Sequence, residues 1–195
     1  MDTQKHHRRS IRVPEHDYAS PGGYFVTIVT WQRECLFGEV VNGEMRLNTA
    51  GKIVQWEWER LPQRFDFIGL GAYTVMPNHF HGTIFFYEMA GATRSGLIIS
   101  AADKTVVPAL AHDDFDGSPL PRGPSPASLG AIIGQFKSRV TKHLWKIPAL
   151  ANTPIWQRNY YEHIIRNNDE LNRIHAYITT NPIQWEKDEE NPGHV

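Results

Sequence analysis

The sequence predicts an α+β domain of ferredoxin-like type, with the element order strand, helix, strand, strand, helix, strand and one appended C-terminal helix. Short β-branched and aromatic runs alternate with stretches in which apolar residues recur every three or four positions. The chain has 195 residues, 41% of them hydrophobic, which is enough for one core. We therefore expect one antiparallel sheet with helices on one face and a terminal helix added to it.

The strands are predicted from runs with high β propensity. The first is expected at about residues 24–31, after Pro21-Gly22-Gly23, and two more at about 65–74 and 79–87. The pair Asn42-Gly43 predicts a small hairpin inside 40–47. A last strand is expected at about 160–166.

Three helices are predicted from their caps and apolar spacing. The first is capped by Asn48 or Thr49 and ends near Pro62. The second begins after Ser128 and runs to about Trp145, with apolar residues at 129, 132, 133, 136, 140 and 144. The third is expected to be capped by Asp169 and to end at Asn181-Pro182.

The domain organisation follows from where these patterns stop. We predict a basic N-terminal arm at residues 1–22, one domain at 23–187 and a tail at 188–195. Within the domain, residues 88–127 are rich in Gly, Ala, Ser, Asp and Pro without periodicity, which predicts a flexible insert.

Charge and cysteine content limit the class of protein. The net charge is −1, and two basic clusters are offset by an acidic stretch at 186–190. The clusters comprise Arg8, Arg9 and Arg12 of the arm, and Lys137, Arg139 and Lys142 of the second helix. They are either solvated surface or DNA contacts. The single Cys35 excludes an internal disulfide, and no apolar run approaches the ~20 residues of a membrane span, so we expect a cytoplasmic protein without a membrane partner.

The segment Pro77-Asn78-His79-Phe80-His81-Gly82 places two histidines two residues apart at the start of a predicted buried strand. Since side chains in a strand alternate between faces, His79 and His81 point the same way and Phe80 points into the core. The pair provides half of a metal site, or else one packed and one surface histidine.

Together with WQRNYYEHIIR at 156–166 and AYITTNP at 176–182, this segment resembles the REP-associated tyrosine transposases. These are single-tyrosine members of the HUH endonuclease group that act on single-stranded DNA. The likeness runs from about residue 24 to about 185. It implies the ferredoxin-like sheet order, a metal held by His79 and His81, and a phosphotyrosine intermediate.

The resemblance makes Tyr177 the nucleophile, on the terminal helix. Asn181 lies four residues on and faces the same way. Related transposases have a glutamine at this offset that completes the metal site. The resemblance therefore implies that Asn181 is the third metal ligand. From the residues alone, Tyr177 is better explained as a half-buried core tyrosine, and Asn181 is equally well explained as a helix end before Pro182.

Other residues near these motifs are candidates for DNA contact. Tyr160 and Tyr161 are alternative candidates for the nucleophile, or they stack on DNA bases. Because neighbouring side chains in a strand point to opposite faces, at most one of the two can face the site. His163, Arg166 and Arg173 could hold a phosphate, or be ordinary strand and helix residues.

With imidazole, amide and phosphate ligands, Mg²⁺ or Mn²⁺ fits better than zinc, for which cysteines are lacking. The expected function is a metal-dependent single-stranded DNA endonuclease and strand transferase acting on hairpin repeats, as a monomer or homodimer. The alternatives are a non-catalytic DNA-binding regulator and a small-molecule hydrolase, for which Glu88 is the nearest carboxylate.

Overall fold

The computed structural model describes residues 17–18, 20–87 and 127–193. Its centre is a four-stranded antiparallel sheet in the order β4-β5-β1-β6, formed by Ile68–Val75, His79–Phe86, Gly22–Val29 and Tyr161–Ile165. This confirms the ferredoxin-like fold expected from the order of the elements. Arg8, Arg9, Arg12, Glu88 and nearly all of the predicted insert lie outside the described residues.

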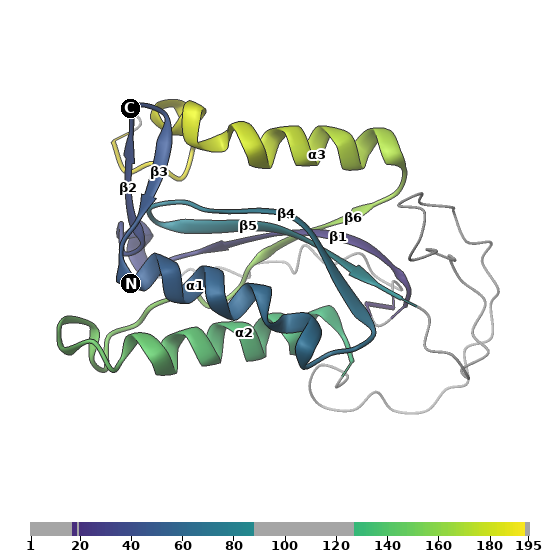
Figure 1. Ribbon diagram of the computed structural model, residues 1–195, viewed down its shortest axis with the longest axis horizontal. Helices are drawn as coiled ribbons and strands as arrows, with labels where there is room; N and C mark the ends of the chain where they lie inside the picture. The colour runs from purple at the N-terminus through teal and green to yellow at the C-terminus, as the bar shows by residue number, and fades with distance from the viewer. Residues whose placement is uncertain (1–16, 19, 88–126, 194–195) are drawn as a thin grey trace, which may run out of the picture.

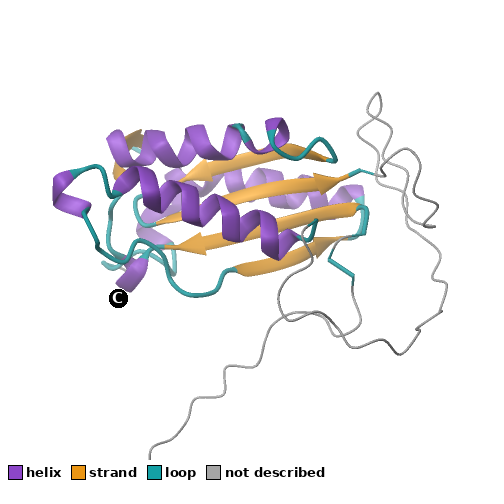
Figure 2. Cartoon of the chain, turned by 90° about the horizontal axis from the view of Figure 1, so that it is seen from below, coloured by secondary structure: helices purple, strands orange, loops and turns teal. Residues whose placement is uncertain are grey.

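Helices cover both faces of this sheet (Figure 1). Helices α1 (Thr49–Glu59) and α2 (Leu129–Leu144) pack side by side on one face, here called the helix-pair face. Helix α3 (Asn168–Thr180) is the appended element and crosses the opposite face, called the α3 face. A 3₁₀ segment, η4 (Asn181–Lys187), follows α3 directly. Figure 2 shows the strands running side by side beneath the helices.

The register of the strands decides which side chains share a face. Thr27 of β1 lies opposite His81 of β5 on one side and Tyr161 of β6 on the other. Directly paired residues point to the same face, so these three side chains belong to the α3 face. Phe80 points the other way and is fully buried, as the sequence predicts.

Two of the predicted helix caps are confirmed and one is wrong. Asn48 accepts a hydrogen bond from the backbone N–H of Gly51, and Ser128 accepts one from Ala131. For α3 the cap is Asn167, whose side chain accepts from the N–H of Glu170. Asp169 instead lies in the first helical turn, where its charge suits the helix dipole.

The predicted hairpin is present as β2 (Gly38–Val41) and β3 (Glu44–Leu47). Both turn residues have positive φ, 53° at Asn42 and 77° at Gly43, which is the reason for an Asn-Gly pair in a two-residue hairpin loop.

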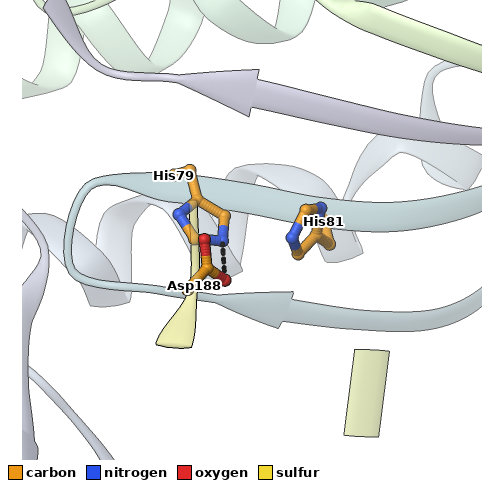
Figure 3. Close-up of side chains that lie close together, drawn as sticks. All are labelled: His79, His81 and Asp188. Atoms are coloured by element: carbon orange, nitrogen blue, oxygen red, sulfur yellow. Dashed lines mark ion pairs between the residues drawn. The ribbon is translucent and has the colours of Figure 1, made fainter. Parts of the chain in front are cut away.

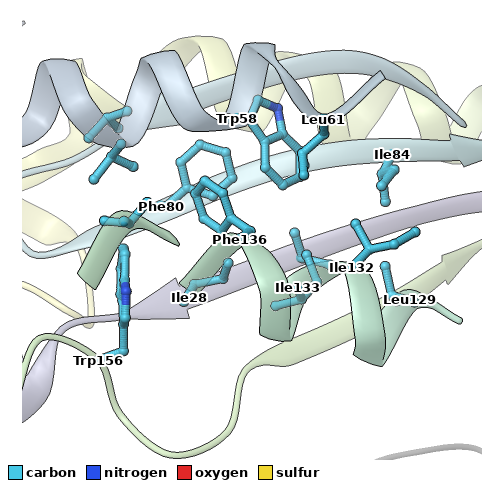
Figure 4. Packing of buried hydrophobic residues seen from close by; sticks show 14 of the residues in the cluster. Ile28, Trp58, Leu61, Phe80, Ile84, Leu129, Ile132, Ile133, Phe136 and Trp156 are labelled. Atoms are coloured by element: carbon cyan, nitrogen blue, oxygen red, sulfur yellow. The ribbon is translucent and has the colours of Figure 1, made fainter. Parts of the chain in front are cut away.

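The main hydrophobic core lies between the sheet and the helix pair (Figure 4). Trp58 of α1 packs against Phe80 of β5 and Phe136 of α2, with ring centroids 4.6 and 5.4 Å away. Gly82 is required here, because a Cβ at this position would lie 2.7 Å from both Trp58 and Phe80. The glycine of the histidine motif therefore serves packing.

In the part of the chain that the structure describes, none of the helices has the length and apolar character needed to span a bilayer.

Candidate metal and tyrosine site

His79 and His81 lie side by side on the α3 face at the start of β5 (Figure 3). Their ring centroids are 4.5 Å apart, and both side chains are buried. Because the sheet backbone fixes both Cα positions, the two imidazoles are held in place without help from a ligand.

The turn before β5 holds this strand end. The N–H of Met76 donates to the carbonyl of His79 at 2.8 Å, and the carbonyl of Asn78 accepts from the N–H of Thr30. The Asn78 side chain is fully buried and donates to the carbonyl oxygens of Arg33 and Glu190 at 3.1 and 2.6 Å. Asn78 thereby ties the turn to two distant parts of the chain.

Asn78 also determines the tautomer of His79. Since its amide nitrogen donates twice, its Oδ1 faces His79 Nδ1 at 2.9 Å and can only accept. Nδ1 of His79 therefore carries the proton, and Nε2 is left with a free lone pair. That Nε2 is buried and has no hydrogen-bond partner among the residues that the structure describes, which suits a metal ligand.

His81 is oriented by Thr27, whose hydroxyl lies 2.8 Å from His81 Nδ1. Its Nε2 points toward α3. Burial, followed by the neighbouring His79, lowers the pKa of His81 well below 6.5. Burial also lowers the pKa of His79 to about 4, against the opposing effects of the Asp188 charge and the Asn181 side chain. Both imidazoles are neutral at pH 7, the form that binds metals.

Asp188, which sequence reasoning missed, completes a three-residue cluster with the histidines. One ligand atom from each of His79, His81 and Asp188 lies within 4.8 Å of the others, and Asp188 Oδ2 is 3.8 Å from His79 Nε2 (Figure 3). The segment 188–195 was predicted to be a tail whose acidic residues only balance charge. Instead η4 reverses the chain and returns the carboxylate to the sheet.

Asn181 is buried beside this cluster, at the junction of α3 and η4. Its Nδ2 donates to Asp188 Oδ2 at 2.8 Å, while its Oδ1 is buried without a hydrogen-bond partner. Two acceptors without partners, Asn181 Oδ1 and His79 Nε2, thus lie next to one carboxylate, which is the environment that a divalent cation satisfies.

Tyr177 of α3 lies over His81. Its hydroxyl is 3.3 Å from His81 Nε2, and the two rings are 5.2 Å apart in an edge-on arrangement. The residue is 42% exposed, so DNA could reach it. Burial, followed by the charges of Asp188, Glu189 and Glu190, raises the pKa of the phenol to about 12.

Tyr161 is the rival tyrosine on the α3 face, and Tyr160 packs against the main core instead. Tyr161 and Tyr177 both meet the ring of Phe25 edge-on, at 6.3 and 6.2 Å. Of these two tyrosines, Tyr177 is the one whose hydroxyl and ring contact His81.

The basic residues predicted in the second helix lie on the other side of the sheet. Lys137 donates to the carbonyls of Gln157, Arg158 and Asn159, and burial lowers its pKa to about 8. Arg139 is paired with the buried Glu57. Lys142 is exposed. Contact between these three residues and DNA stays a prediction.

The remaining candidates lie near the start of α3. His163 is paired with Glu170 at 2.7 Å, and the N–H of Arg166 donates to the same carboxylate. Glu170 is seven residues, about two turns, before Tyr177. The structure therefore does not bring His163 to the metal cluster. The side chains of Arg166 and Arg173 are exposed, and their role stays a prediction.

Comparison with known proteins identifies one similar sequence and one solved structure of similar fold. No protein-family model matches the chain. An uncharacterized protein of Haemophilus influenzae is 37% identical over 185 residues, which cover 94% of this chain and 93% of that protein. Among solved structures, a REP-associated tyrosine transposase bound to a REP hairpin is similar, with a TM-score of 0.50 and 18% identity over 89% of this chain and 74% of that one. The similarity to the solved transposase structure shows that the two proteins share a fold.

Proposed function

This chain belongs to one family with the Haemophilus influenzae protein, and we propose that it is a metal-dependent endonuclease and strand transferase for single-stranded DNA. The observation that carries the proposal is the Tyr177 hydroxyl, 3.3 Å from Nε2 of His81 at the edge of the His79–His81–Asp188 cluster. A tyrosine next to a buried metal-binding group is the arrangement that transesterification of a phosphodiester needs.

The donor atoms fit a divalent cation. His79 Nε2, His81 Nε2 and an Asp188 oxygen would hold it, and the buried Oδ1 of Asn181, whose Nδ2 donates to Asp188, would be a fourth donor. Two imidazole nitrogens with carboxylate and amide oxygens suit Mn²⁺ or Mg²⁺. When bound, the cation supplies positive charge that polarises the scissile phosphate and offsets charge on its oxygens.

The chemical step uses Tyr177 as the nucleophile. Its hydroxyl oxygen forms a bond to phosphorus while the bond between phosphorus and the 3′-oxygen breaks. The products are a 5′-phosphotyrosine and a free DNA 3′-hydroxyl, which takes up a proton as it leaves. The phosphotyrosine keeps the energy of the broken linkage, so a later 3′-hydroxyl can reverse the reaction without ATP.

The proton of the phenol has a nearby acceptor. Because the pKa of Tyr177 is raised to about 12, the phenol is neutral at pH 7. His81 is neutral as well, and in the metal-free protein its Nε2 lies 3.3 Å from the phenol oxygen and can accept the O–H. With a cation on this nitrogen, the phenol proton would pass to water instead. Tyr177 is therefore protonated in the resting site. Its deprotonation for nucleophilic attack requires additional positive charge nearby, which would stabilise the phenolate.

The partner we propose is hairpin DNA with adjacent unpaired bases. Support comes from the solved structure of similar fold, which holds a REP hairpin. The 42% exposure of Tyr177 is consistent with access by an unpaired strand and excludes a fully enclosed small-molecule pocket around this residue.

The test uses 5′- or 3′-labelled single-stranded hairpin oligonucleotides with Mn²⁺ or EDTA, and detects DNA attached to protein on denaturing gels. Wild type is expected to form an adduct with Mn²⁺ and none with EDTA. Tyr177→Phe is expected to form none. Tyr161→Phe is the matched control, since it removes a hydroxyl from the other tyrosine that contacts Phe25, and its adduct is expected to persist.

The opposite results are equally informative. An adduct that survives Tyr177→Phe and disappears in Tyr161→Phe would transfer the nucleophile to β6. Hairpin binding with Mn²⁺ but without any adduct would favour the non-catalytic regulator over the enzyme.

A further inference from the structure

The outer surface of α1 and α2 carries an exposed tryptophan among basic side chains. We call this surface the Trp56 patch and define it by Trp56, Arg60, Arg139, Lys142, His143 and Lys146. Trp56 is 43% exposed, although α1 buries its other tryptophan, Trp58, completely. An exposed indole surrounded by cations has no packing purpose of its own.

Trp56 is oriented by two neighbours. The guanidinium of Arg60 lies 4.6 Å from the centre of the indole ring, within cation–π range. The ring of His143, from α2, meets it edge-on with centroids 5.6 Å apart. The two helices therefore hold the indole in a defined position at the surface.

A buried carboxylate fixes the cations beside it. Glu57 is fully buried, and its Oε2 accepts from Arg64 at 2.5 Å and from Arg139 at 3.1 Å. His143 Nε2 lies 3.3 Å from Oε1 of the same carboxylate. One negative charge thus faces two arginines and a histidine, so the surrounding cationic charge exceeds it.

The rest of the patch adds positive charge, and within the described part of the chain Lys142 and Lys146 form no ion pair with an acidic residue. Lys142 is exposed on α2, three residues after Arg139, and Lys146 is exposed in the turn that follows the helix. The exposed acid of α1, Glu59, accepts instead from Tyr73 and Gln55 on the β4 side of the helix. An anionic partner is therefore favoured on this surface.

We propose that the Trp56 patch binds an unpaired nucleotide of the DNA, with the base stacked on Trp56 and the flanking phosphates beside Arg60 and Lys142. An aromatic platform within a basic groove or surface is the usual means of holding a single strand without sequence preference. The patch lies on the helix-pair face and is separated by the sheet from the histidines and Tyr177 (Figure 1). The inference rests on the proposed function for the identity of the polymer, and adds a second contact to it.

The experiment measures binding of a labelled 20-nucleotide oligo-dT by fluorescence anisotropy, with all variants made in a Tyr177→Phe background so that binding is read without cleavage. Trp56→Ala is expected to raise Kd about tenfold, the loss of one stacked base, and Trp56→Phe to recover most of the affinity. Trp145→Ala is the matched control. Trp145 is equally exposed at 43% but is the C-cap residue of α2, and its indole N–H donates to the carbonyl of Thr153.

The contribution of the basic side chains to binding is measured from the dependence of the binding constant on salt concentration. Arg60→Gln and Lys142→Gln are each expected to reduce the slope of log K against log salt by about 0.7, the single-strand value for one phosphate contact. Equal Kd values for Trp56→Ala and Trp145→Ala, with thermal unfolding confirming that both are folded, would overturn the proposal, as would an unchanged salt slope.

A duplex oligonucleotide separates stacking from simple charge attraction. Trp56→Ala is expected to leave duplex binding unchanged, and equal losses for duplex and oligo-dT would overturn the stacking role. Adduct formation is measured separately with Tyr177 intact. Persistence of the adduct together with normal oligo-dT binding in Trp56→Ala overturns only this inference, whereas absence of any adduct in wild type overturns the proposed function.

Discussion

The two faces of strand β5 differ sharply in the side chains that they bury. Phe80, Gly82 and Ile84 face the helix pair, within a large apolar core. His79, His81 and Thr83 face α3, and all three are buried polar residues. One strand of eight residues therefore belongs to the core and to the candidate site at once.

The comparison shows how the chain tolerates buried polar groups. On the α3 face only Phe25, Ile165, Leu171 and Ile178 form a buried apolar cluster among the described residues. The helix-pair face supplies most of the buried apolar area, and the hydrophobic effect scales with that area. The stability of the fold is thus concentrated on one face, and the other face holds groups that contribute chemistry at a cost in stability.

The largest expected effect tests this asymmetry. Phe136→Ala should lower the free energy of unfolding by about 3–5 kcal/mol, because the ring is fully buried against Trp58 and Phe80. Ile178→Ala should cost about 2 kcal/mol, at the lower end for a buried aliphatic residue, since its cluster is small. Urea unfolding at pH 7.5 measures both. Equal losses would show that α3 belongs to the main core and would remove the distinction.

The second effect is a dependence of stability on pH that belongs to the α3 face. An unfolded histidine takes up its proton near pH 6.5, whereas burial lowers the pKa of His79 to about 4 in the fold. Between these values the unfolded state binds more protons, so acidification favours unfolding, by roughly 3 kcal/mol over the whole window. His79→Gln removes this contribution.

The measurement is urea unfolding of metal-free protein in EDTA between pH 7.5 and 5. Wild type is expected to lose stability more steeply than His79→Gln as the pH falls, because the other titrating groups are common to both. Parallel curves would mean that His79 takes up a proton in the folded state at its ordinary pKa.

The difference between the faces also explains what the sequence predicts well. Both helices of the helix pair and all four sheet strands follow from local patterns of propensity, caps and apolar spacing, because a large apolar core imposes regular periodicity. The spacing of His79 and His81 puts both on one strand face, whereas Tyr177 and Asn181 were selected through the resemblance to the REP-associated tyrosine transposases.

Asp188 could not be selected in this way. It lies seven residues after Asn181, directly after the 3₁₀ segment η4, where the path of the chain depends on tertiary contacts such as the hydrogen bond from Asn78 to the Glu190 carbonyl. The partners of Lys137 and Arg139 within the fold could not be predicted either, and contact of these two residues with DNA stays a prediction. Their charges suggested solvent or DNA, but three carbonyls and a buried carboxylate from other elements engage them, which no local pattern reveals.

The third prediction concerns the support of the metal ligands. Asn78→Ala should weaken Mn²⁺ binding about 10- to 100-fold, because it removes the acceptor that keeps the proton on Nδ1 of His79. Isothermal titration calorimetry with Mn²⁺ measures this change. Gln63→Ala, at an exposed position outside the site, is the control and should bind as wild type does. Normal Mn²⁺ affinity in Asn78→Ala would show that burial alone orients the ring.

The smallest expected effect concerns the start of α3, the helix that carries Tyr177. Asn167→Ala should cost about 1 kcal/mol of unfolding free energy, because it leaves the N–H of Glu170 without its cap. Asp169→Ala, by contrast, removes only a charge near the helix N-terminus and should cost a few tenths of a kcal/mol. A larger loss in Asp169→Ala would restore the cap predicted from sequence. Since Glu170 also holds His163, a loss well above 1 kcal/mol in Asn167→Ala would show that this cap and the His163–Glu170 pair act together to fix α3 on its face of the sheet.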